Sequence, residues 1–127
     1  MNTERAKRKL SAILSADVKG YSRLMGEDEV ATVRTLKEYR QLMSKLTKEY
    51  RGRVVDSPGD NVLAEFASVV DALECSIEIQ KLLRTKNAVL PDNRKTEFRI
   101  GVNLDELVKS RKSPFSVIPA KAAIQYF

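Results

Sequence analysis

The first regular pattern along the chain is an apolar run over residues 10–17, with the sequence Leu-Ser-Ala-Ile-Leu-Ser-Ala-Asp. A short apolar run closed by a carboxylate predicts a buried strand that ends at Asp17. A turn over 18–22 follows, and the acidic residues at 27–29 suit the start of a helix, where the helix dipole favours negative charge. Apolar residues then recur at three- and four-residue spacing: Val30, Val33, Leu36, Tyr39, Leu42, Met43, Leu46 and Tyr50. Gly52 is the expected residue just beyond the end of this helix.

The second half of the pattern predicts a hairpin, a helix and a last strand. Residues 53–66 place two β-rich segments around a Ser-Pro-Gly-Asp-Asn turn, with Asp60 at its exposed tip. Ser68 begins a second helix that runs to about residue 87, and alternating residues over 97–103 predict a fourth strand. The predicted fold class is therefore α+β: a ferredoxin-like βαββαβ arrangement with an antiparallel sheet and both helices on one face.

The pattern divides the chain into three parts. Residues 1–9 form a basic leader, 10–104 form one domain, and 105–127 lack a sustained period. We interpret this last segment as a tail of low order, or as an isolated helix around 120–125.

The composition limits the kinds of catalytic and metal-binding site that the chain can form. The 127 residues include one cysteine and no histidine, which argues against an internal disulfide, a zinc site or a histidine-based nucleophile. The sequence holds neither an apolar run long enough for a membrane span nor a secretory signal, so we expect a cytoplasmic protein. The net charge of +6 is concentrated at the ends: 1–9 carry +3 and 107–127 carry +4. Since the basic residues are not interleaved with aromatic ones, we expect no specific nucleic-acid partner.

Asp17 and Asp60 are the candidate functional residues. If the strand that ends at Asp17 lies beside the hairpin, the two carboxylates converge, and together with backbone carbonyls they form a set of hard oxygen ligands suited to Mg²⁺ or Mn²⁺. Each residue has a simpler interpretation as well, Asp17 as a strand-end residue and Asp60 as a turn former.

The chain resembles the catalytic domain of bacterial class III adenylate/guanylate cyclases over roughly residues 7–104. The residues that carry the resemblance are Arg8-Lys9-Leu10, Ala16-Asp17-Val18, 20–29, Gly59-Asp60, Ala64-Glu65-Phe66, 68–72, 77–80 and 97–104. The resemblance implies an enzyme that converts ATP to cyclic AMP and pyrophosphate with two divalent metal ions. It implies that Asp17 and Asp60 bridge the metals, that the carbonyl of Val18 is a further ligand, and that Gly20 and Tyr21 bind nucleotide phosphate through backbone N–H groups.

The chain departs from the family pattern in two places. Asp56 stands where the family usually has a lysine that recognises adenine, and nothing in 105–127 matches the family segment that contributes an asparagine and an arginine across a dimer interface. We therefore expect a C-terminally truncated domain that forms a homodimer, or a heterodimer with another cyclase domain, and is nearly inert alone. The alternatives are a non-catalytic binding or regulatory module with a cyclase-like fold, and a metal-free ferredoxin-like adaptor.

Overall fold

A computed structural model of the chain describes residues 8–55, 60–108, 116–118 and 125–126. The helices are α1 (Tyr21–Glu27), α2 (Glu29–Glu49) and α3 (Val69–Asn87), with a short 3₁₀ turn η1 (Asp92–Arg94). The strands are β1 (Arg8–Val18), β2 (Gly52–Val55), β3 (Val62–Phe66), β4 (Phe98–Val108), β5 (Ser116–Ile118) and β6 (Gln125–Tyr126). The first four strands with α2 and α3 confirm the predicted βαββαβ order.

The strands form one antiparallel sheet in the order β2-β3-β1-β4-β5, and β6 also pairs with β4. β1 lies at the centre of the sheet. Its residues Ala12–Ala16 pair with β3, while its full length pairs with β4, from Arg8 opposite Val108 to Val18 opposite Phe98. This central strand therefore aligns the ends of β3 and β4 beside its own C-terminal end.

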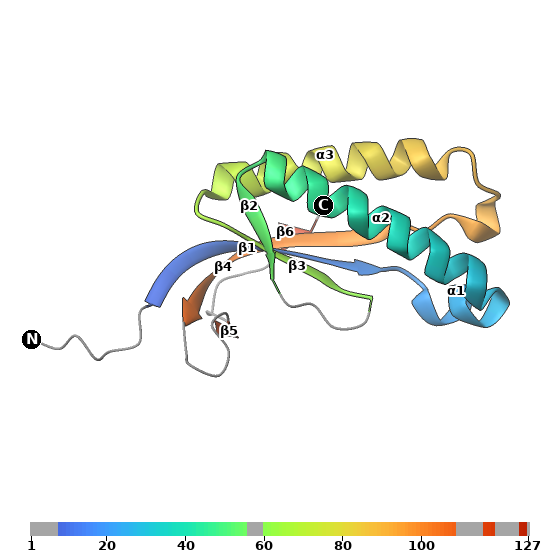
Figure 1. Cartoon of the computed structure of the whole chain (residues 1–127), viewed down its shortest axis with the longest axis horizontal. Coiled ribbons are helices and arrows are strands. Elements are labelled where there is room, and N and C mark those ends of the chain that lie inside the picture. Colours follow the sequence, from blue (N-terminus) through green and yellow to red (C-terminus); the bar gives the residue numbers. More distant parts are fainter. Residues whose placement is uncertain (1–7, 56–59, 109–115, 119–124, 127) are drawn as a thin grey trace, which may run out of the picture.

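Helices α2 and α3 lie along one face of the sheet (Figure 1). Because side chains alternate along a strand, every second residue of β1 points into the core beneath these helices. Those core residues are Ala12, Leu14, Ala16 and Val18. The intervening positions, which include Ser15 and Asp17, belong to the opposite face of the sheet.

Side-chain caps stand at both of the helix starts that the sequence predicted. The Asp28 carboxylate accepts a hydrogen bond from the Ala31 N–H at 3.0 Å, and the Ser68 hydroxyl accepts one from the Asp71 N–H at 3.2 Å. These side chains satisfy backbone donors that have no partner within the first helical turn. In the part of the chain that the structure describes, no helix combines the length and apolar character needed to cross a membrane.

Two local predictions before the hairpin are wrong. The sequence predicted a turn over 18–22 and a helix that starts at 27–29, but α1 already begins at Tyr21, after Gly20 in the left-handed conformation (φ 63°). Seven residues are too short to give a clear helical period. The positive-φ residue after α2 is Arg51 (φ 65°), and Gly52 instead opens β2, where an added Cβ would lie 2.3 Å from the Phe66 ring. Close packing, therefore, is what requires glycine at this position.

The fourth strand is longer than predicted. β4 continues past Leu104 to Val108, where its last residues pair with β5, a strand that the local pattern did not indicate. The predicted helix around 120–125 lies mostly outside the described residues, and Gln125 belongs to β6. The division of the chain at Leu104 into domain and tail stays a prediction.

Candidate functional site

A small cavity of about 170 Å³ lies at the C-terminal end of β1. It is lined by Ser15, Ala16, Asp17, Asn61, Leu63 and Arg99, contributed by three adjacent strands and the residue just before β3. Asp17 is one of the half-buried residues of this cavity, with 37% of its side chain exposed. The sequence-predicted carboxylate on β1 thus sits in a concave site bounded by polar groups.

Arg99 binds both carboxylate oxygens of Asp17. The two residues lie directly opposite each other in the β1–β4 register. The Arg99 Nε–H donates to Asp17 Oδ1 at 3.0 Å, and Nη2 donates to Oδ2 at 2.7 Å. The sequence analysis did not identify Arg99 as a site residue, because only the strand register brings it to Asp17 across 82 residues of chain.

The hairpin brings its own polar residues to the same end of β1. Ala16 pairs with Val62, so Asn61 lies beside Asp17 if the register continues, and both residues line the cavity. Asp60 precedes Asn61 directly and is half-buried, not at an exposed tip as predicted. The backbone segments therefore meet as expected, while the convergence of the Asp17 and Asp60 carboxylates stays a prediction. The side-chain oxygen of Asn61 is a further possible metal ligand. The sequence pattern indicated Asn61 only as a turn residue.

The remaining predicted site residues lie around the end of β1. The Val18 side chain is buried in the core, and the next residue, Lys19, donates its N–H to the Glu97 carbonyl at 2.8 Å. Gly20 caps α1, and Tyr21 is its first residue, half-buried against the core. Asp56 lies outside the described residues.

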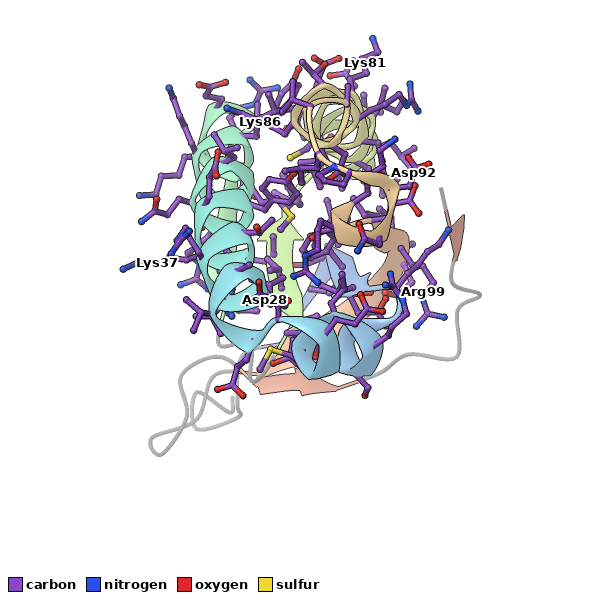
Figure 2. All side chains as sticks on the ribbon, turned by 90° about the vertical axis from the view of Figure 1, so that its right-hand side faces the viewer. Asp28, Lys37, Lys81, Lys86, Asp92 and Arg99 are labelled. Carbon is purple, nitrogen blue, oxygen red and sulfur yellow. The ribbon has the colours of Figure 1, made fainter. Side chains whose placement is uncertain are left out.

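A larger cavity of about 640 Å³ adjoins the site between α3 and β4. Arg99 lines both cavities. The other cationic residues around the larger one are Lys19, Lys81, Arg84 and Lys95. Figure 2 shows Arg99 and Asp92 on the side of the molecule away from Lys37 of α2. A third cavity of about 780 Å³ runs along α2. Tyr21 lines it, but neither Asp17 nor Asp60 does, so we do not assign the functional site to this cavity despite its larger volume.

Comparisons with known proteins agree with this arrangement. No protein-family model matches the chain. Over 109 residues the chain is 40% identical to "Putative adenylate cyclase 3" of Rhizobium meliloti (strain 1021), covering 85% of this chain and 19% of that protein. The solved adenylate/guanylate cyclase/hydrolase from Silicibacter pomeroyi is 32% identical, with a TM-score of 0.78 over 91% of this chain and 66% of that one. This chain belongs to the class III adenylate/guanylate cyclase family.

Other matches extend the likeness of this cyclase-family chain. The adenylyl cyclase CyaB from P. aeruginosa shares the fold, with a TM-score of 0.74 at 21% identity over 92% of this chain and 69% of that one. The chain is also 26% identical over 113 residues to the serine/threonine-protein kinase pkn2 of Myxococcus xanthus, covering 85% of this chain and 14% of that protein. The chain thus spans less than a fifth of each curated relative.

The oxygen ligands available in the cavity at the end of β1 suit a hard divalent cation. Among the described residues, no group of three or more histidine, cysteine, aspartate or glutamate side chains gathers in one place. The site instead offers the Asp17 carboxylate and the Asn61 amide oxygen in one cavity, with Asp60 next in sequence. Mg²⁺ prefers oxygen ligands and is usually bound by one or two protein carboxylates, with water and substrate phosphates completing its shell. The oxygen atoms of Asp17 and Asn61 are therefore of the kind that Mg²⁺ or Mn²⁺ prefers.

Proposed function

We propose that this chain forms the metal-binding part of a nucleotide cyclase active site and acts on ATP to give cyclic AMP and pyrophosphate. The observation that carries the proposal is the position of Asp17: it lies in a polar cavity at the end of the central strand, beside the segment that contains Asp60 and Asn61. The 40% identity to a curated adenylate cyclase supports the same assignment.

Each predicted site residue has a role in this proposal. The carboxylates of Asp17 and Asp60 and the carbonyl of Val18 hold the divalent ions. When bound, such ions lower the pKa of an attacking hydroxyl and neutralise charge on the leaving polyphosphate. Gly20 permits the left-handed turn that starts α1, so that the backbone at Gly20 and Tyr21 can face the nucleotide phosphates.

We propose that the complete active site needs a different cyclase domain as partner, because a second copy of this chain would add no residue that the first one lacks. Phosphoryl-transfer enzymes that lose a charge-stabilising arginine become slower by about 10³–10⁵-fold. Since the resemblance assigns no residue of this chain to that arginine, the chain by itself, as a monomer or a homodimer, is expected to be nearly inactive.

The second candidate is a non-catalytic binding or regulatory module with the same fold. Two observations favour it: Asp56 stands where the family usually has a lysine, and Arg99 occupies both oxygens of Asp17. Such a module would associate with a cyclase domain without contributing metal ligands.

Metal binding distinguishes the two candidates. Mn²⁺ is titrated into the purified chain in the presence of a non-cyclising ATP analogue, and free Mn²⁺ is followed by its electron paramagnetic resonance signal. Asp17→Asn and Asp60→Asn should each weaken binding at least about tenfold, since even residues outside the ligand shell change metal affinity by about 10–100-fold. The control is Asp71→Asn, which alters an aspartate held by Arg51 rather than one at the cavity. Equal binding by all four proteins would reject the metal site and leave the regulatory module.

A further inference from the structure

The Asp17–Arg99 pair uses the same oxygens that a metal would need. The guanidinium contacts Oδ1 and Oδ2 at once, at 3.0 and 2.7 Å, which is the bidentate geometry favoured by arginine and carboxylate groups. Both residues sit on regular strands, in direct register, so the geometry is set by the sheet rather than by a loop. The backbone of the sheet therefore holds Asp17 and Arg99 next to each other.

A bound arginine opposes metal binding through charge. A guanidinium remains protonated at any pH that the protein survives, so it cannot release the carboxylate by losing a proton. A divalent ion at the same carboxylate would lie within a few ångströms of this positive group, where like charges repel. The ion must either displace Arg99 or bind a carboxylate whose charge is already compensated.

Displacement is feasible because the pair is partly exposed to solvent. The side chains of Arg99 and Asp17 are 57% and 37% exposed, and ion pairs of this exposure add little to stability. A guanidinium released from Asp17 can therefore be solvated by water.

We propose that Arg99 is a positioning residue that holds Asp17 when the metal is absent and is exchanged for the metal on binding. This inference rests on the proposed function, because it assumes that Asp17 is a metal ligand. It adds that the strength of the Asp17–Arg99 pair sets the metal affinity of the site. Removing Arg99 should then tighten metal binding, the opposite of what loss of a merely structural residue would do.

The test compares Mn²⁺ affinity, without nucleotide, among the wild type, Arg99→Gln, Arg99→Lys and the control Arg51→Gln. Arg51 forms the matched bidentate pair with Asp71, away from the cavity. Arg99→Gln should bind Mn²⁺ about two- to fivefold more tightly, the range that exposed ion pairs contribute. Arg99→Lys should fall between this variant and the wild type, because lysine keeps the charge but loses the bidentate contact. Arg51→Gln should match the wild type.

A second readout follows Arg99 itself. In ¹⁵N NMR, the Arg99 Nε–H signal is assigned as the cross-peak absent from Arg99→Gln, and it should shift in step with Mg²⁺ occupancy. Equal or weaker Mn²⁺ binding by Arg99→Gln would overturn the exchange, and so would an Nε–H signal that saturating Mg²⁺ does not shift. The proposed function would still stand in either case if Asp17→Asn weakened Mn²⁺ binding. Absence of Mn²⁺ binding by both wild type and Arg99→Gln, with and without the non-cyclising ATP analogue, would overturn both proposals.

Discussion

Asn87 connects α3 to α2 and to the segment that leads into β4, and its replacement by alanine is expected to destabilise the domain strongly. Its Oδ1 accepts hydrogen bonds from the Tyr39 hydroxyl at 2.8 Å and from the Thr96 N–H at 2.9 Å. Its Nδ2 donates to the Thr96 carbonyl at 2.9 Å. All three residues are buried, with exposures of 7% for Asn87, 2% for Tyr39 and 1% for Thr96. Asn87→Ala therefore leaves three buried polar groups without these partners.

The magnitude follows from those three groups. A buried donor or acceptor that loses its partner costs about 1–3 kcal/mol. Contributions within one network do not add fully, so we expect Asn87→Ala to lower the free energy of unfolding by about 3–5 kcal/mol. The same change should disturb the entry into β4, which carries Arg99, because Thr96 precedes that strand by two residues.

The assay is urea unfolding followed by circular dichroism, with Tyr39→Phe and the double variant completing a cycle. Tyr39→Phe in the wild type should cost about 1 kcal/mol, the usual net contribution of a hydrogen bond. In the Asn87→Ala background the same change removes a hydroxyl that has lost its partner, so it should be neutral or stabilising. If Tyr39→Phe costs the same in both backgrounds, the two side chains are not coupled and the reasoning is refuted.

Two further predictions concern packing and pH. Gly52→Ala should lower the free energy of unfolding by about 1–3 kcal/mol, because the new Cβ would overlap the Phe66 ring, whereas Gly26→Ala, with no atom within 4 Å, should be neutral or stabilising. Burial raises the pKa of the Cys75 thiol to about 11, against about 8.5 in an unfolded chain. The neutral thiol therefore favours the folded state, and stability present below pH 8.5 should decline by about 2 kcal/mol by pH 10. Urea unfolding at both pH values checks this, and a decline just as large in Cys75→Ala would assign it to other groups.

The local sequence pattern was sufficient to predict β1 and α2, the central strand and the longest helix. The apolar run before Asp17 and the three- and four-residue spacing of α2 identified these elements, and the βαββαβ order then restricts the sheet to few arrangements. The spacing correctly placed Leu36, Tyr39 and Met43 in the core, but Val30 and Val33, which it assigned to the same apolar face, are 68% and 51% exposed. The placement of Asp17 at the end of a buried strand followed directly from the apolar run before it.

Features that depend on contacts distant in sequence could not be predicted in the same way. Arg99 looks like an ordinary polar position of an alternating strand, and only the β1–β4 register makes it the partner of Asp17. Gly52 resembles a helix-ending glycine, yet its requirement comes from Phe66 on the neighbouring strand. The last residues of β4 form a strand against β5, a pairing that no local period reveals.

Cyclic AMP formation in a mixed sample tests the central claim most directly. This chain is combined with a second cyclase domain whose own metal-binding aspartates are replaced by asparagine, and Mn²⁺-ATP is added. We predict that the mixture forms cyclic AMP while each protein alone is nearly inactive, and that Asp17→Asn or Asp60→Asn in this chain abolishes the product while Asp71→Asn does not. Two chains that co-elute as a complex yet form no cyclic AMP, or a product unaffected by Asp17→Asn, would contradict the account.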